Sequence, residues 1–129
     1  MPDAVPRLTI PRLHVCTTCR AGQPLPDDGV PPGQHTFDAV ARALAETPTA
    51  TLHPVVCLAS CARGCAAVIS MPGKWSYLLG GLTPDMASDL LAYAAAYAAS
   101  KTGVLMPSRR PASLADCVLA RIPDLAAAA

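Results

Sequence analysis

Two short segments hold five of the six cysteines in this chain of 129 residues. "CTTC" places Cys16 and Cys19 three positions apart, and "CLASCARGC" places Cys57, Cys61 and Cys65 at intervals of four. Each segment begins at the end of a run of β-branched and aliphatic residues, which is typical of a β-strand. If the two strands are neighbours in one sheet, both cysteine segments lie at the same edge of that sheet. The cysteines therefore constrain the strand arrangement as well as the chemistry.

Hydrophobic periodicity and turn residues predict a small mixed sheet with helices packed on it, of α/β or α+β class. Strands are expected at residues 7–15, 51–56, 66–70 and 74–79. Helices are expected at residues 35–46 and 84–100, with a last short helix at 113–122. Residues 20–33 are rich in proline and glycine and are expected to form a long loop, of the kind that serves a site or is mobile. The predicted core is a βαββα arrangement, followed by the short C-terminal helix.

Length and charge exclude several classes of protein. With 52% apolar residues, the chain is expected to form one domain, 1–129, with a core at 7–103 and a C-terminal extension at 104–129. A net charge of +1 favours neither nucleic acid nor a membrane surface as a partner. The first residues lack the pattern of a signal peptide, and the apolar run at 90–99 is too short to span a bilayer. A cytoplasmic location is expected, where structural disulfides are rare, so the thiols are interpreted as ligands or redox groups.

The clustered thiols allow three kinds of site. Among metals, thiolates select zinc, copper(I) or iron–sulfur clusters. Zinc sites often combine two C-x2-C pairs, and only Cys16 and Cys19 have that spacing. The wider spacing of Cys57, Cys61 and Cys65 suits an iron–sulfur cluster. The "CTTC" segment also resembles a thioredoxin-type dithiol, but a proline-rich loop follows it instead of the helix that activates such thiols.

The remaining candidate residues carry weaker signals. Cys117 lies far from the other cysteines in sequence and is interpreted as a packing residue. His14, His35 and His53 are interpreted as surface or strand residues. The motifs do not supply the two histidine ligands that a Rieske-type cluster needs.

These motifs give the chain a resemblance to the thioredoxin-like [2Fe-2S] ferredoxins. The matching pieces are "HVC", "TTC", the helix from His35, "VVCLASCARG", the hairpin "VISMPGKWSYLL" and the final helix "TPDMASDLL". The whole chain also resembles an uncharacterised bacterial family of predicted metal-binding proteins. That family has the same cysteine-rich segments, a "PGKW-Y" turn and a terminal "RP…ARIP" segment, which here reads "RRPASLADCVLARIP".

The ferredoxin resemblance implies a thioredoxin-like fold and a [2Fe-2S] cluster bound by Cys16, Cys19, Cys57 and Cys61. The chain departs from that pattern in the close spacing of the first pair and in having Cys65 where those ferredoxins usually have proline. Cys65 is an additional or alternative ligand, or a non-ligating thiol that packs beside the cluster. We favour the last interpretation, because strand geometry fixes the direction of its side chain. A [4Fe-4S] cluster or zinc is the alternative cofactor.

The resulting prediction is a one-electron carrier of ferredoxin type rather than an enzyme. Its expected partner is a redox protein, and a homodimer is left open. Arg20, Arg63 and Lys74 lie near the cysteine segments in sequence, where they either solvate the surface or offset cluster charge and steer an acidic partner. The alternatives are a dithiol redox protein and a non-enzymatic metal-binding protein for zinc or metal delivery. For the latter, the resemblance to the predicted metal-binding proteins implies a link to cobalamin biosynthesis.

Overall fold

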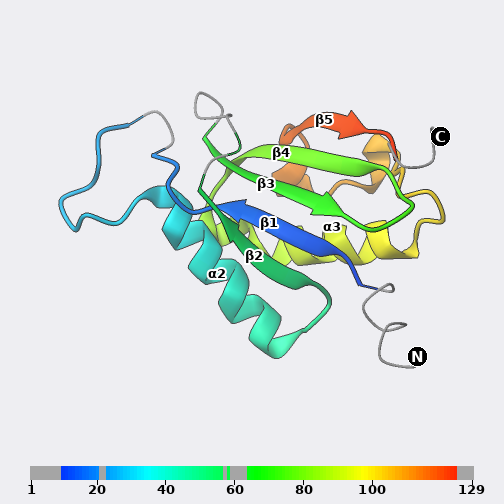
Figure 1. Cartoon of the computed structure of the whole chain (residues 1–129), viewed down its shortest axis with the longest axis horizontal. Coiled ribbons are helices and arrows are strands. Elements are labelled where there is room, and N and C mark those ends of the chain that lie inside the picture. The colour runs from blue at the N-terminus through cyan, green and yellow to red at the C-terminus, as the bar shows by residue number, and fades with distance from the viewer. Residues whose placement is uncertain (1–9, 21–22, 57, 59–63, 125–129) are drawn as a thin grey trace.

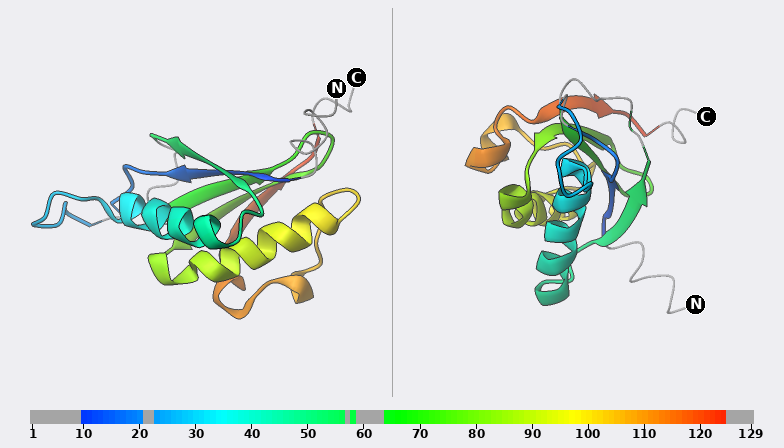
Figure 2. Two further views of the ribbon diagram at one scale, coloured as in Figure 1. Left: turned by 90° about the horizontal axis from the view of Figure 1, so that it is seen from below. Right: turned by 90° about the vertical axis from the view of Figure 1, so that its left-hand side faces the viewer.

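The computed structural model describes residues 10–20, 23–56, 58 and 64–124. Its elements are β1 (Arg12–Cys16), α2 (Pro32–Glu46), β2 (Thr51–Val55), β3 (Cys65–Ser70), β4 (Ser76–Leu82), the single-turn helix η2 (Pro84–Met86), α3 (Ala87–Ala99), the single-turn helices η3 (Pro107–Arg109) and η4 (Ala112–Leu114), and β5 (Val118–Ile122). Within this part of the chain, α2 and α3 pack on one face of a five-stranded sheet and no helix covers the other face (Figure 1, Figure 2).

The strand order β2-β1-β3-β4-β5 decides where the cysteine segments lie. β1 and β2 pair in parallel, with Cys16 opposite Val55, so both strands end at the same edge of the sheet. β3 is antiparallel to β1, with Val15 opposite Ala67, so β3 begins at that edge (Figure 1). The predicted convergence of the two cysteine segments is confirmed for the strand ends that flank them.

The alternation of side chains along β1 separates the two faces of the sheet. Leu13 and Val15 point into the core under the helices and are fully buried. Arg12 and His14 take the opposite face, because successive side chains of a strand point to opposite sides. The open face of β1 is therefore polar at Arg12 and His14, whereas Cys16 at the end of the strand is buried in the core.

Three tyrosines form the centre of the core. Tyr93 and Tyr97 lie on the inner face of α3, four residues apart, and both are buried. Tyr77 on β4 meets the two rings edge-on, at centroid distances of 5.9 and 6.3 Å. The hydroxyl of Tyr77 also accepts a hydrogen bond from the backbone N–H of Leu105 at 2.9 Å. The chain that follows α3 is thereby tied to the core.

Most of the predicted elements are confirmed. The strands expected at 51–56, 66–70 and 74–79 correspond to β2, β3 and β4, with small shifts at their ends. The first strand ends at Cys16 as expected but begins at Arg12, and residues 7–9 of the predicted strand lie outside the described residues. The helix expected from His35 begins earlier, at Pro32, because the fixed backbone angle of proline suits the first helical position.

The predicted C-terminal helix at 113–122 is wrong. Only the single turn η4 is helical, and the chain then forms β5, which pairs antiparallel with β4. Leu79 lies opposite Val118 and Ser76 opposite Ile122. The backbone groups of β4 on that side need hydrogen-bond partners, and pairing with β5 satisfies them. Pairing with β4 therefore stabilises a strand here, although the capping pattern at residues 113–116 favours a helix.

The turn at residues 71–75 lies at the sheet edge opposite the cysteines (Figure 1). The N–H of Lys74 donates to the carbonyl of Met71 at 3.2 Å, and Gly73 has a φ of 77°, as a turn of this kind requires. We call residues 71–75, together with Tyr97, Gly103 and Arg121, the hairpin edge.

Candidate functional site: the cysteine edge

The "CTTC" segment is bound to the end of β2. The thiol of Cys16 donates to the carbonyl oxygen of Val56 at 3.4 Å, and the hydroxyl of Thr18 donates to the same oxygen. The backbone N–H of Thr17 donates to the carbonyl of Val55 at 2.9 Å. These bonds fix the first cysteine segment against the residues that lead into the second. We call residues 16–19, 55–56 and 64–65 the cysteine edge.

Cys65 joins this edge from the start of β3. Gly64 precedes it with a φ of 80°, a conformation that glycine adopts without strain. The side chain of Cys65 is 2% exposed. Burial raises the pKa of its thiol to about 11; a hydrogen bond from the hydroxyl of Thr36 opposes the rise, and the Cys19 and Cys16 side chains add to it. The thiols of Cys19 and Cys16 therefore lie close enough to Cys65 to affect its pKa.

The first turn of α2 packs against the backbone of the "CTTC" segment. The N–H of Gly33 donates to the carbonyl of Cys19 at 2.9 Å. A Cβ atom on Gly33 would overlap the carbonyl oxygen of Cys16 and would lie 3.0 Å from the nitrogen of Cys19. Only glycine allows the helix to approach this closely.

This contact corrects one step of the sequence argument. The proline-rich loop does separate "CTTC" from α2 in sequence, but the loop returns the start of the helix to the cysteines in space. The partial positive charge at a helix N-terminus stabilises thiolates. The start of α2 therefore lies against the backbone of Cys19, although the loop separates the two in sequence.

Two of the predicted ligands, Cys57 and Cys61, lie outside the described residues. Within the part of the chain that is described, no three Cys, His, Asp or Glu side chains form a group that could hold a metal ion. The described part of the site thus supplies two predicted ligands, Cys16 and Cys19, with Cys65 beside them. Both predicted ligands are almost fully buried, with side chains 3% and 4% exposed.

The other candidate residues lie at different distances from this edge. Lys74 is on the hairpin edge, where its ammonium group donates to the carbonyl of Ala98 at 2.8 Å. The expected role of Lys74 beside the cysteines is therefore wrong. Arg20 follows Cys19 directly and is exposed, whereas Arg63 lies outside the described residues.

Cys117 occupies the turn before β5 and is 7% exposed. Its thiol donates to the carbonyl of Ser113 at 3.6 Å, and its own carbonyl accepts from the N–H of Gly80 at 2.8 Å. These contacts agree with the packing role that its sequence position suggested, although the surrounding element is a turn and not a helix.

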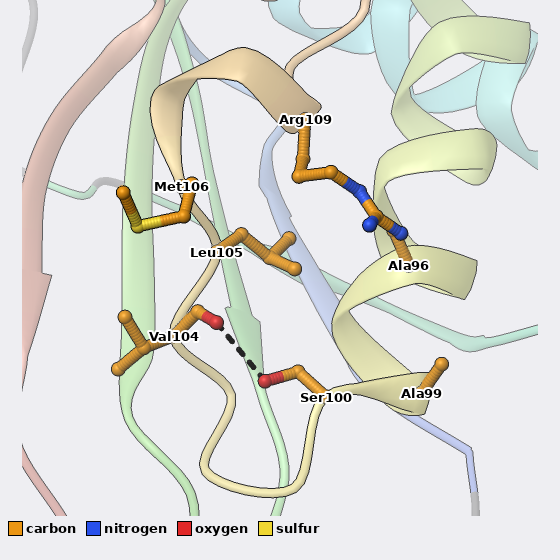
Figure 3. A pocket seen from close by; sticks show the side chains of 7 residues that line it. All are labelled: Ala96, Ala99, Ser100, Val104, Leu105, Met106 and Arg109. Atoms are coloured by element: carbon orange, nitrogen blue, oxygen red, sulfur yellow. Dashed lines mark hydrogen bonds between the residues drawn. The ribbon is translucent and has the colours of Figure 1, made fainter.

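A shallow pocket of about 270 Å³ lies between α3 and the segment that follows it (Figure 3). It is lined by Ala96, Ala99, Ser100, Val104, Leu105, Met106 and Arg109. The Ser100 hydroxyl donates to the Val104 carbonyl at 3.0 Å, so the only hydroxyl in the lining is engaged with backbone. This pocket contains none of the thiols and does not extend the cysteine edge.

Sequence reasoning did not find the pairing of two histidines in the middle of β1 and β2. His14 on β1 lies directly opposite His53 on β2, and the rings stack with centroids 4.9 Å apart. Burial, followed by the positive charges of His53 and Arg12, lowers the pKa of His14. Nothing in the sequence sets the register of these two strands, so the pair could be recognised only in the folded chain.

The fold is thioredoxin-like. A search of solved structures found "Structure of a thioredoxin-like [2Fe-2S] ferredoxin from Aquifex aeolicus", with a TM-score of 0.56 and 17% sequence identity. The match covers 87% of this chain and 92% of the ferredoxin. At this identity the similarity establishes the fold, and the predicted fold class is confirmed. The [2Fe-2S] cluster is a property of the ferredoxin with which the fold is compared.

A family model described as "Protein of unknown function (DUF1636)" matches residues 13–124, and the chain belongs to this family. The match includes the cysteine edge and also β5. No curated protein matches the chain. Among the described residues, none of the helices has the length and apolar character needed to cross a membrane.

Proposed function

We propose that this protein is an iron–sulfur protein that carries single electrons, with a [2Fe-2S] cluster at the cysteine edge. One observation carries the proposal. Parallel pairing of β1 and β2 brings "CTTC" to the residues that lead into the second cysteine segment, and antiparallel β3 returns the end of that segment to the same place. The fold similarity to a thioredoxin-like [2Fe-2S] ferredoxin supports the same function.

The chemistry of the two described thiols, Cys16 and Cys19, suits such a cluster. Cys16, Cys19, Cys57 and Cys61 would hold it, and thiolates are the ligands that iron–sulfur clusters use. The cluster would supply one-electron oxidation and reduction. The chain contributes burial of the two described thiols and the N-terminus of α2, whose partial positive charge offsets the charge of the thiolates. Thr18 and Thr17 hold the first ligand segment against β2.

The exposed surface beside the thiols suits contact with a redox protein. The side chain of Val56 is 73% exposed, while its carbonyl accepts the hydrogen bond from the Cys16 thiol. Arg20, which directly follows Cys19, is also exposed. An acidic partner that docks here would come within one residue of the ligand segment. We propose a cytoplasmic electron carrier that is not itself an enzyme.

The ligand assignment is tested by replacing one cysteine at a time. We expect Cys57→Ala and Cys61→Ala to lose the visible absorption and the iron of the anaerobically purified protein, because each removes an anionic ligand that water replaces poorly. Cys117→Ala is the matched control, since it removes a buried thiol from the turn before β5. It should keep the full iron content and an unchanged spectrum.

Different outcomes would separate the alternatives. A Cys61→Ala variant with full iron and an unchanged spectrum would remove Cys61 from the ligand set. A colourless wild-type protein that contains zinc would establish a zinc or metal-delivery protein. A metal-free protein whose Cys16 and Cys19 exchange with dithiols would establish a dithiol redox protein.

A further inference from the structure

A hollow on the open face of the sheet is lined by four polar side chains. Arg12, His14, Thr51 and His53 surround a volume of about 380 Å³. Its lining lies at the start and middle of β1 and β2, away from the strand ends that carry the cysteines. No helix of the described chain covers this face (Figure 2). The hollow is therefore separate from the proposed cluster and open to solvent.

The parallel register places the four side chains as two facing pairs. Arg12 lies opposite Thr51, and His14 lies opposite His53. All four share one face, because side chains two positions apart on a strand point the same way. The hydroxyl of Thr51 and Nε2 of His53 are 2.9 Å apart and hydrogen-bonded, which holds the orientation of the ring. The arrangement is a consequence of strand pairing.

The stacking of the two imidazole rings limits which ligand can fit. Their planes are 23° apart and their centroids are 4.9 Å apart. The nitrogen lone pairs of an imidazole lie in its ring plane, and a metal ion must lie about 2 Å from each ligating nitrogen. One ion cannot lie in the planes of two stacked rings. These two histidines are thus not placed to chelate a metal ion.

The same arrangement suits an anion with several oxygen atoms. Arg12 offers five N–H donors and keeps its positive charge, while the Thr51 hydroxyl holds the His53 ring by donating to its Nε2. His53 then presents Nδ1–H, and His14 presents its own ring N–H, to different oxygen atoms of the same ligand. As far as the described residues go, the lining holds no carboxylate that would repel an anion.

We propose that this hollow binds a small anion with several oxygen atoms, carried by a phosphate or a carboxylate group. Arg12 neutralises the charge of the ligand, and the stacked His14 and His53 donate to separate oxygen atoms. The site does not depend on the cluster, because none of its four residues is a proposed ligand.

The test is calorimetric titration of the purified protein with pyrophosphate and, separately, with citrate. We expect saturable binding of at least one of them, weakened about tenfold or more in Arg12→Gln, which removes the positive charge, and in His53→Gln, which removes the ring N–H held by stacking. Arg42→Gln is the matched control, since Arg42 is an exposed cation on α2. It should leave the affinity unchanged. The iron content of each variant should equal that of the wild type, which separates this site from the cluster.

The two probes distinguish the sources of the anion. Tighter binding of pyrophosphate assigns a phosphate ligand, and tighter binding of citrate assigns a carboxylate ligand. Binding of neither probe would overturn the proposal. The proposal would also be overturned if Arg42→Gln weakened anion binding as much as Arg12→Gln does. Binding would then depend only on the net charge of the protein. Zinc binding that His53→Gln abolishes, without anion binding, would show a metal site instead.

Discussion

The two edges of the sheet are closed by different means. At the hairpin edge, aromatic and cationic side chains pack on each other. The hydroxyl of Tyr97 donates to the carbonyl of Trp75 at 2.5 Å, the guanidinium of Arg121 lies 4.8 Å above the Trp75 ring, and Lys74 lies over the ring of Tyr97. Gly103 fits beneath them with a φ of 83°. Ring stacking of the cations and the hydrogen bond of Tyr97 hold this edge together.

At the cysteine edge, small side chains and backbone groups make the contacts. The threonines of "CTTC" bond to carbonyls at the end of β2, and Gly33 brings α2 against the same backbone. The buried side chains there are thiols. The comparison shows that aromatic and cationic packing holds the hairpin edge, whereas contacts of small side chains and backbone groups surround the buried thiols of the cysteine edge. Each edge contains a glycine that no larger residue can replace without displacing its neighbours.

The largest effect on stability is expected for Gly103→Ala. A Cβ atom there would lie 2.9 Å from Lys74 Cβ, from Trp75 O and from Tyr97 Cε1, and alanine is also strained at this φ. We expect the free energy of unfolding in urea to fall by about 3 kcal/mol, with the iron content per folded chain unchanged.

Gly73→Ala is the control for this effect. Gly73 has a similar φ of 77° in the same edge, but a Cβ atom there has no neighbour within 4 Å. Its loss should be about 1 kcal/mol, the cost of the backbone conformation alone. Equal losses in the two variants would mean that close packing does not distinguish Gly103.

Gly33→Ala tests the other edge. Alanine would normally favour a helix by about 1 kcal/mol over glycine, so any loss reports the contact with the "CTTC" backbone. We expect the carbonyl of Cys16 to be displaced and the iron content to fall at least about twofold, with a stability loss of about 1–3 kcal/mol. Full iron content in a stable Gly33→Ala protein would show that this close approach does not position the cysteines.

Tyr97→Phe should have a smaller effect, confined to stability. It leaves the carbonyl of Trp75 without its buried donor, which costs about 1–2 kcal/mol. Burial raises the pKa of Tyr97 to about 12 in the folded protein, above the unfolded value near 10. The unfolded chain therefore loses the proton first, and the contribution of Tyr97 is full below pH 10 and falls as the pH rises toward 12. Chemical unfolding from pH 9 to about pH 12 should show this fall in the wild type, and a shallower one in Tyr97→Phe.

The smallest effect is expected for Cys65→Ser. The side chain of Cys65 is fixed by β3, and we favour a thiol that packs beside the proposed cluster without binding it. The reduced variant should retain the wild-type electron paramagnetic resonance signal and the wild-type iron and sulfide content. A shifted signal that indicates oxygen ligation, or loss of the cluster, would make Cys65 a ligand.

Much of this arrangement could be predicted from local sequence. The runs before Cys16 and Cys57 are β-forming, so two strands could be predicted from them. If the two strands are neighbours, as β1 and β2 are, the cysteine segments that follow them lie together. The approach of α2 to "CTTC" could not be predicted, because a long loop separates them in sequence. The stacking of His14 on His53 depends on the register of β1 and β2, which is fixed only by tertiary packing. The C-terminal strand was missed because its stability comes from pairing with β4.

The most direct test of the central claim is the metal content and resonance spectrum of the wild-type protein purified without oxygen. The account predicts a brown protein with iron and acid-labile sulfide in equal amounts, and a signal that appears after reduction by one electron. The Cys117→Ala protein should give the same result. A colourless protein with zinc, or with no metal and no sulfide after reconstitution with iron and sulfide, would contradict the proposal that the cysteine edge holds an iron–sulfur cluster.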